Sequence, residues 1–217
     1  MLKTLGEENS ILNKFVAELR DRDIQKEPMR FRYNLERIGE IMAYEISKSL
    51  NYTRKTVETP LGEAEMSLPG DEVVLAAILR SGLPMHNGFL RFFDTSESAF
   101  VAAYRHYSKD GSFKIDIESL TSPALAGKTL IIIDPMLATG ASIEVAYKNL
   151  VMTGGEPDRI HLATVIASED GVDYVRRHFP PQITTLWTAA VDAELTVKSY
   201  IVPGIGDTGD LAFGEKI

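Results

Sequence analysis

The sequence predicts an α/β fold in which helices flank a central, mostly parallel β-sheet. Three short apolar runs, at 73–79, 130–133 and 160–167, are typical of strands buried on both faces of a parallel sheet. Helical patterns separate these runs, and strands that alternate with helices at this spacing form βαβ crossovers. A chain of 217 residues can bury one sizeable core, so we expect a single domain over 1–217.

The composition excludes several classes of protein. A net charge of −8 argues against a general nucleic-acid binder, which needs a positive surface against phosphates. The absence of cysteine excludes disulfides, zinc–thiolate sites and thiol nucleophiles. The first residues lack the apolar core of a signal peptide, and no later run reaches the length of a membrane span. We therefore expect a cytoplasmic protein that does not enter the membrane.

Residues 1–50 are predicted to be mainly helical and to pack over the edge of the sheet. Apolar residues recur there at helical spacing, with a break at Glu27-Pro28. They are Ile11, Phe15 and Leu19 in the first segment, and Leu35, Ile38, Ile41, Met42 and Ile46 in the second. The tract from Asn51 to Glu65 alternates threonine with charged residues, and it predicts either a hairpin or an extended arm.

A strand, an acidic turn and a helix follow one another without spare residues from Thr129 to Leu150. Asp134 stands at the carboxyl end of the strand, where ligands bind in open α/β sheets. The turn from Ala138 to Ser142 is small and rich in hydroxyls, so its backbone N–H groups can surround an anion. The helix that follows has one apolar stripe and ends at Gly154-Gly155. The stripe consists of Ile143, Ala146, Tyr147, Leu150 and Val151.

This arrangement favours a sugar phosphate as the ligand. A helix dipole contributes only about 0.3–1 kcal/mol at an exposed terminus, whereas each hydrogen bond to a charged group adds about 1.5–3 kcal/mol. Three or four N–H donors of the turn could therefore hold a phosphate dianion. Asp134 cannot bind the same anion, but its carboxylate can accept hydrogen bonds from the two hydroxyls of a ribose whose 5′-phosphate lies in the turn.

Two arginines follow other predicted strands. The run 73–79 brings Arg80 to the same sheet edge as Asp134, and a strand from Ala99 to Tyr104 ends at Arg105. An isolated arginine after a strand is more often a solvated surface charge. The polar segment 106–114 contains the turn signal Asp110-Gly111, which predicts a β-hairpin.

The remaining elements are predicted as a helix at 85–93, a helix at 170–178 and a strand at 183–187. His86, His161 and His178 lack the spacing of metal ligands, so we interpret them as structural. The stretch from Pro203 to Asp210 holds too many glycines for a helix or strand, and we expect a shaped loop there. A glycine-rich surface tail is the alternative interpretation.

Three motifs resemble the uracil phosphoribosyltransferases, which belong to the type I phosphoribosyltransferase family. They are DPMLATGAS at 134–142, ILRSGL at 78–83 and YIVPGIGDTGD at 200–210. Their common order makes the resemblance specific, although each motif alone is a weak signal. Pro135 stands where most type I relatives have a second acid, as it does in the uracil enzymes. The resemblance runs from about Arg30 to the end of the chain.

The resemblance implies a reaction of uracil with 5-phosphoribosyl 1-pyrophosphate (PRPP) that gives UMP and pyrophosphate. It also implies Mg²⁺ held mainly by PRPP, without direct protein ligands, and a flap at 106–114 that closes over PRPP. The implied catalytic residues are Asp134, Arg105 and Asp207. The implied PRPP-binding residues are Arg80, Arg105, Asp134, Pro135, Met136, Leu137, Ala138, Thr139, Gly140, Ala141, Ser142 and Asp207, and the implied uracil-binding residues are Ile201, Gly206, Asp207 and Thr208.

The type I fold also implies a core at about 70–190 and a small hood formed by about 1–50 and 190–217. Members of the family commonly form homodimers or larger homo-oligomers, and GTP activates some of them. Two alternatives stay open at this point. One is a type I transferase for another nucleobase; the other is a pyrimidine-sensing regulator that keeps the fold and binds RNA.

Overall fold

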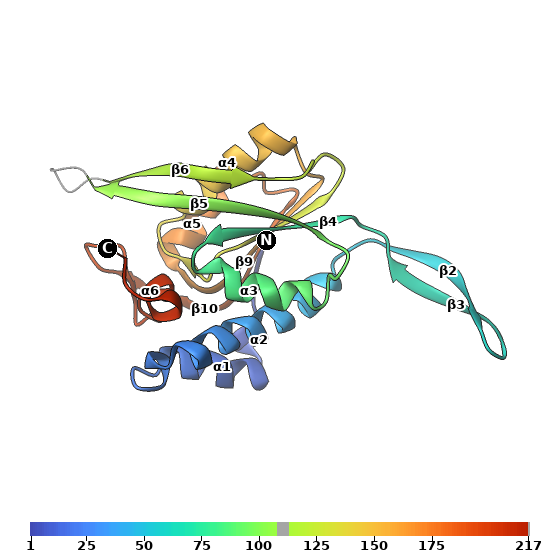
Figure 1. Cartoon of the computed structure of the whole chain (residues 1–217), viewed down its shortest axis with the longest axis horizontal. Coiled ribbons are helices and arrows are strands. Elements are labelled where there is room, and N and C mark those ends of the chain that lie inside the picture. Colours follow the sequence, from blue (N-terminus) through green and yellow to red (C-terminus); the bar gives the residue numbers. More distant parts are fainter. Residues whose placement is uncertain (108–112, 217) are drawn as a thin grey trace.

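The structure, a computed structural model, describes residues 1–107 and 113–216, and it describes 104–107 and 113–115 by their backbone alone. A central sheet carries helices on both faces, and a two-stranded hairpin projects from one end of the molecule (Figure 1). The α/β fold predicted from the apolar runs is confirmed. In these described ranges, no helix combines the length and the apolar composition needed to cross a membrane.

The sheet is mostly parallel, as predicted. Its strands lie in the order β1, β10, β9, β7, β4, β5, β6, and only β5 and β6 pair in antiparallel fashion along this path. A short strand, β8 (Met136–Leu137), pairs with β9 beyond the end of β7. The bounds are β1 Leu2–Thr4, β4 Val73–Leu79, β5 Glu97–Tyr107, β6 Phe113–Thr121, β7 Thr129–Ile133, β9 Arg159–Ser168 and β10 Thr184–Asp192.

The strand order reverses at β4, which pairs with β5 on one side and β7 on the other. From β4 the chain passes through α3 (Gly82–Leu90) to β5, and it returns from β6 to β7 on the opposite flank of β4. Ligands bind at such switch points, outside the carboxyl ends of the strands. Arg80 follows β4 and Asp134 follows β7, so this edge brings both residues together.

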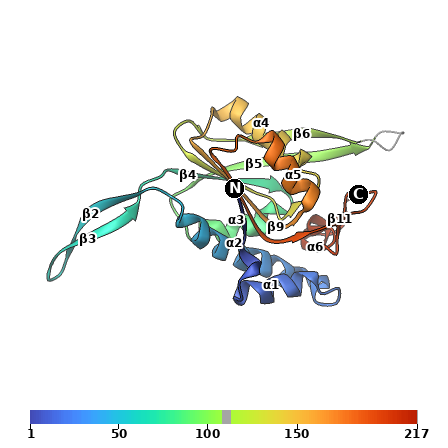
Figure 2. The ribbon, with the colours of Figure 1, turned by 180° about the vertical axis from the view of Figure 1, so that it is seen from behind.

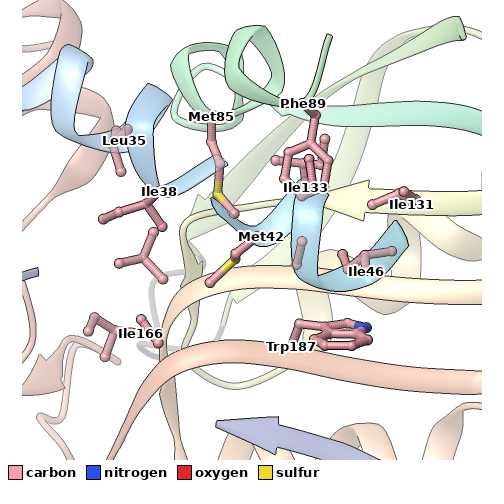
Figure 3. Packing of buried hydrophobic residues seen from close by; sticks show 14 of the residues in the cluster. Leu35, Ile38, Met42, Ile46, Met85, Phe89, Ile131, Ile133, Ile166 and Trp187 are labelled. Atoms are coloured by element: carbon pink, nitrogen blue, oxygen red, sulfur yellow. The ribbon is translucent and has the colours of Figure 1, made fainter. Parts of the chain in front are cut away.

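The N-terminal helices α1 (Ile11–Arg20) and α2 (Pro28–Ser47) cover one face of the sheet together with α3. Figure 3 shows the apolar side of α2 packed against α3 and against strands β7, β9 and β10. The prediction that these helices pack over the sheet edge is therefore wrong, because α2 lies across a face. Contacting residues include Ile38, Met42 and Ile46 of α2, Met85 and Phe89 of α3, and Ile131, Ile133 and Trp187 of the sheet.

The opposite face is covered by α4 (Ala141–Gly154) and α5 (Glu169–His178) (Figure 2). Ile143, Ala146 and Leu150 of α4 are buried there beside Val172 and Val175 of α5. This confirms three residues of the apolar stripe predicted after the acidic turn; Tyr147 is partly buried against the same cluster, and Val151 does not belong to it. The packing fixes the start of α4 against the sheet.

Residues 1–50 are mainly helical, as predicted, with two local differences. Leu2–Thr4 form the edge strand β1 beside β10, and three residues are too few to produce a pattern in the sequence. In α1 the buried positions are Leu12 and Leu19, whereas Ile11 is 59% exposed. Two short 3₁₀ helices, η1 (Leu5–Glu7) and η2 (Ile24–Lys26), flank α1.

Two hairpins leave the body of the fold. The tract predicted as a hairpin or arm forms strands β2 (Tyr52–Thr59) and β3 (Gly62–Pro69), which make a separate sheet that projects away (Figures 1 and 2). Strands β5 and β6 form the second hairpin, as the Asp-Gly signal predicted. Its turn, with Lys109, Asp110 and Gly111, lies outside the described residues, so closure of a flap over a ligand stays a prediction.

The C-terminal stretch is only partly a loop. A small sheet of β11 (Glu194–Leu195) and β12 (Ile201–Val202) precedes it, and helix α6 runs over Thr208–Phe213. The prediction of a loop through Asp210 is therefore wrong from Thr208 onward. The cause is a cap, because Oδ1 of Asp207 accepts a hydrogen bond from the backbone N–H of Asp210 at 3.0 Å.

Candidate active site

A cavity of about 400 Å³ lies at the switch point between β4 and β7. The carboxyl ends of the strands form its floor, and the C-terminal stretch forms the opposite wall; Figure 1 shows α6 near these strand ends. Three segments far apart in the sequence supply most of the lining: 78–81, 134–143 and 199–209, with Ala103 and Lys216 in addition. Cavities at this position are the usual ligand sites of open α/β folds.

The turn that precedes α4 is shaped for close approach to an anion. Gly140 has a φ of 80°, in the left-handed region, and it is the N-cap residue of α4. A Cβ atom at this position would lie 2.5 Å from Cδ1 of Tyr174, so only glycine fits. Thr139, Gly140 and Ser142 all line the cavity at the N-terminus of the helix. The backbone N–H groups of such a turn and the helix dipole both favour a phosphate.

Tyr174 of α5 supports this turn from behind. Its hydroxyl donates a hydrogen bond to Oε2 of Glu144 at 2.5 Å, and its ring stacks on His178 with centroids 3.8 Å apart. Burial alone would raise the pKa of Glu144, but hydrogen bonds from Lys148 and Tyr174 bring that pKa below its usual value. Glu144 is therefore held as a carboxylate in the first turn of α4. Its hydrogen bond with Tyr174 joins α5 to the turn from Ala138 to Ser142, which we call the anion turn.

Arg80 links the loop after β4 to the C-terminal wall of the cavity. Its Nη2 lies 2.7 Å from Oδ1 of Asp210, and its Nη1 donates to the carbonyl oxygen of Gly214 at 3.1 Å. The Nε atom is buried without a hydrogen-bond partner in the part of the chain that the structure describes. A guanidinium with a donor left over is suited to an additional anionic partner.

Asp134 and Ser81 join the two sides of the switch point. The hydroxyl of Ser81 donates to Oδ1 of Asp134 at 3.3 Å, and both residues line the cavity. The cavity therefore contains one carboxylate at the end of β7 and the anion turn a few residues beyond it. This spacing fits a sugar whose hydroxyls meet Asp134 while its phosphate meets the turn.

The C-terminal wall includes a short glycine-containing stretch beside Tyr200 and Lys216. Gly206, Asp207, Thr208 and Gly209 line the cavity in succession. The peptide bond between Val202 and Pro203 is cis, and Gly206 has a φ of 75°. The backbone N–H and C=O groups of this stretch can match the donors and acceptors along the edge of a planar base.

Comparisons with known proteins agree with these motifs. The sequence model of the family described as uracil phosphoribosyltransferase matches residues 7–215. A curated uracil phosphoribosyltransferase from Porphyromonas gingivalis is 57% identical over 213 residues, which cover 98% of each chain. The curated enzyme of the same name from Sulfolobus acidocaldarius is 35% identical, with 94% of this chain and 96% of the relative covered. The chain belongs to the uracil phosphoribosyltransferases.

Solved structures support the fold of this uracil phosphoribosyltransferase. A protein from Aquifex aeolicus superposes with a TM-score of 0.87 at 28% identity, covering 99% of this chain and 98% of the other. A hypoxanthine phosphoribosyltransferase from Staphylococcus aureus superposes with a TM-score of 0.50 at 13% identity, covering 86% and 83%. The second likeness shows the type I fold alone.

Most of the residues that the resemblance implied lie around one cavity. Those that line it are Arg80, Asp134, Met136, Leu137, Ala138, Thr139, Gly140, Ser142, Gly206, Asp207 and Thr208. Pro135, Ala141 and Ile201 are not among the lining residues; the side chain of Ile201 is buried in the core, at 4% exposure. The side chain of Arg105, like those of His106 and Lys114, lies outside the described residues.

The cavity also contains residues that sequence reasoning did not select. Ser81, Ser199, Tyr200 and Lys216 line it. Ser81 and Tyr200 stood inside the motifs and could have been chosen by position. Ser199 precedes the third motif by one residue, and Lys216 follows it by six, so the sequence carried no comparable signal for either.

Proposed function

We propose that this cavity transfers the ribose 5-phosphate group of PRPP to N1 of uracil, giving UMP and pyrophosphate in pyrimidine salvage. The observation that carries the proposal is the convergence of the three motif segments on one cavity. In the reaction, N1 bonds to the anomeric carbon while the bond from that carbon to the pyrophosphate oxygen breaks. The electron pair leaves with pyrophosphate, and the N1 proton passes to solvent.

Asp134 and the anion turn would hold the ribose phosphate between them. The turn from Thr139 to Ser142 binds the 5′-phosphate, and Asp134 accepts hydrogen bonds from the ribose hydroxyls. Its negative charge also lies beside the sugar as the anomeric carbon becomes cationic. No covalent nucleophile is needed, since positioning and charge stabilisation supply the rate enhancement.

Arg80 and Arg105 would bind the departing pyrophosphate. The unpaired Nε of Arg80 supports this role, because a further anionic partner would satisfy it. The hairpin of β5 and β6, from which Arg105 comes, would close over PRPP and keep water from the cationic sugar. The antiparallel pairing of β5 and β6 supports a hairpin at this position. The closing role of its turn is proposed from the resemblance to the uracil phosphoribosyltransferases.

The donor set of the cavity fits Mg²⁺ carried by PRPP. Asp134 and Asp207 offer carboxylate oxygens, which are hard ligands, and both line the cavity. Within the described residues, no three acidic, histidine or cysteine side chains form a site that could hold the ion alone. Asp207 would approach a metal chelated by the diphosphate, and the bound ion would neutralise charge on the leaving group.

The segment Gly206-Asp207-Thr208, with Ile201 behind it, would recognise uracil. Uracil has two carbonyl acceptors with an N–H between them, and backbone groups of a fixed loop can pair with all three. A base with another donor pattern would leave buried groups unpaired, which costs a large factor in rate.

One assay tests the proposal. UMP formation from uracil and PRPP is measured with and without Mg²⁺, with cytosine, orotate and guanine as alternative bases. We expect a nucleotide product with uracil alone and only in the presence of Mg²⁺. A product with another base and none with uracil would show a transferase for that base. RNA binding that weakens steeply with salt, in a chain that forms no nucleotide, would show the regulator instead.

Three further properties are proposed on the resemblance. The chain would fold as one domain over 1–217, with a core at about 70–190 and a hood made by the terminal segments. It would assemble as a homodimer or a larger homo-oligomer in the cytoplasm, and GTP would activate it. Light scattering measures the assembly, and the rate of UMP formation with added GTP measures the activation.

A further inference from the structure

The wall of the cavity at 203–207 is fastened from outside the cavity, through Gly204. The backbone N–H of Gly204 donates to Oδ2 of Asp192 at 2.8 Å, and its carbonyl oxygen accepts from Nη1 of Arg20 at 3.0 Å. Both peptide groups of one loop residue are thus held by side chains from other elements. Gly204 is two residues before Gly206 and three before Asp207, which line the cavity.

Arg20 and Asp192 are bound to each other by a two-pronged ion pair. Nη1 of Arg20 lies 2.8 Å from Oδ2 of Asp192, and Nη2 lies 2.7 Å from Oδ1. Asp192 is only 7% exposed, and the side chain of Arg20 is 26% exposed. Asp192 is the last residue of the core strand β10, so the pair holds the loop at a fixed position relative to the sheet. A planar guanidinium can make all three contacts at once, and a lysine ammonium cannot do so in this geometry.

The loop turns tightly at the point where it is held, and only glycine fits there. Gly204 has a φ of 57°, and a Cβ atom there would lie 2.2 Å from the carbonyl oxygen of Ile201. Gln25 lies beside the same loop: its Nε2 donates to the carbonyl oxygen of Arg20 at 3.3 Å, and its Oε1 lies 3.2 Å from the position that a Cβ atom on Gly206 would occupy. The end of α1 and the segment after it therefore form a platform beneath the loop.

We propose that Arg20 and Asp192 are positioning residues for uracil, which hold the loop at 203–207 so that its backbone groups match the base. This inference rests on the proposed function, since it assigns a role in that same reaction. Neither residue lines the cavity, so neither touches the substrates. Their effect is confined to the C-terminal wall, whereas the anion turn and Asp134 are supported by β7, α4 and α5. Asp207 is the one residue assigned to PRPP that lies in this loop, and its carboxylate is held separately by α6, because its Oδ1 accepts a hydrogen bond from the backbone N–H of Asp210 at 3.0 Å. Uracil binding should therefore depend on the pair much more than PRPP binding does.

The test separates the two substrates. In Arg20→Gln we expect the KM for uracil to rise by about tenfold, the change that follows from losing one charge-assisted hydrogen bond. The KM for PRPP should stay within about twofold of its original value. Arg20→Lys keeps the positive charge, so its KM for uracil should lie between that of the unaltered protein and that of Arg20→Gln. If Arg20→Gln does not fold, the KM values for uracil and PRPP are compared in Arg20→Lys and Asp192→Asn instead.

Arg30→Gln is the matched control. Arg30 also makes a two-pronged ion pair with α1, from Nε and Nη2 to the oxygens of Glu18 at 2.8 and 2.7 Å, but it does not touch the loop. This variant should lower the melting temperature and leave both KM values unchanged. Amide hydrogen exchange gives a readout without catalysis: the backbone amides of 204–207 should exchange faster in Arg20→Gln and at the original rate in Arg30→Gln.

Equal increases in both KM values, or unchanged exchange at 204–207 in Arg20→Gln, would overturn the inference and leave the proposed function intact. An unaltered chain that forms no UMP from uracil and PRPP would overturn the proposed function, and this inference with it. A selective rise in the KM for uracil, with faster exchange at the loop, supports both.

Discussion

Arg80, which lines the cavity, is bound to Asp210 of α6, with Nη2 of the guanidinium 2.7 Å from Oδ1 of the carboxylate. A second prong of the same guanidinium reaches the carbonyl oxygen of Gly214 at 3.1 Å. The guanidinium of Arg80 therefore joins the loop after β4 to the C-terminal segment that contains helix α6. The N–H donors of a guanidinium are fixed in one plane. The contacts with Asp210 and Gly214 therefore also set the direction of the N–H groups that are left to bind a ligand.

Arg80→Lys should weaken PRPP binding although it keeps the positive charge. Loss of the fork removes at least one directed contact, worth about 1.5–3 kcal/mol at a charged group. We expect the KM for PRPP to rise by about tenfold to a hundredfold, measured with PRPP varied at saturating uracil. The control is Arg91→Lys, since Arg91 pairs with Glu36 and Glu40 of α2 at 2.5 and 3.3 Å, away from the cavity lining. Equal KM values for the two variants would contradict the role of Arg80.

Asp134→Asn should reduce turnover far more than stability. The substitution keeps the shape of the side chain and removes the negative charge beside the ribose. By analogy with the loss of one preorganised electrostatic group, kcat should fall by about 10²- to 10³-fold. The melting temperature should change by less than about 4 °C, which corresponds to about 1 kcal/mol in a chain of this size. Proportionate losses in rate and melting temperature would show that Asp134 serves the fold instead.

Gly140→Ala should disturb the anion turn through contact with the ring of Tyr174. The added methyl group would lie 2.5 Å from Cδ1 of that ring, and the left-handed φ of 80° adds strain of about 1–2 kcal/mol. Gly127→Ala separates the two effects, because Gly127 has nearly the same φ, 79°, with no atom within 4 Å of its Cβ position. We expect both variants to lose stability and only Gly140→Ala to raise the KM for PRPP. A raised KM for PRPP in both variants would mean that backbone strain far from the anion turn is enough to weaken PRPP binding.

His161 should make the protein less stable as the pH falls. Burial, and then the nearby charge of Arg159, lower the pKa of His161 to about 4. Between its usual pKa of about 6.5 and this value, the unfolded chain binds a proton that the folded chain does not. The free energy of unfolding should therefore decrease over this range, by at most about 3 kcal/mol for this residue.

Urea unfolding from pH 7 to pH 4 measures the effect of His161. The comparison variant is His161→Gln, whose amide oxygen can still accept the hydrogen bond that Trp187 Nε1 donates to His161 Nδ1 at 3.1 Å. The variant should lack the part of the pH dependence that belongs to the histidine. Parallel pH profiles for the two proteins would exclude His161 as its source.

Local signals in the sequence predicted the parts of the site that lie within one strand–turn–helix unit. The apolar run, Asp134 and the small residues up to Ser142 are close in sequence, so a single pattern contains them. Helix α6 was missed because glycine in its first turn outweighed the capping signal of Asp207. The attachment of the loop through Arg20 could not be predicted, since 172 residues separate Arg20 from Asp192 and neither has a neighbouring motif.

The division of the cavity wall between the two ends of the chain has a consequence for synthesis on the ribosome. The platform at Arg20 and the strand end at Asp192 exist in a nascent chain before residues 199–216 emerge. A growing chain released before that point could complete every strand of the large sheet and still lack one side of its pocket. Premature termination near codon 198 would also remove Ile201, Ile205 and Ala212 from the main core, so the product would lose stability together with its pocket.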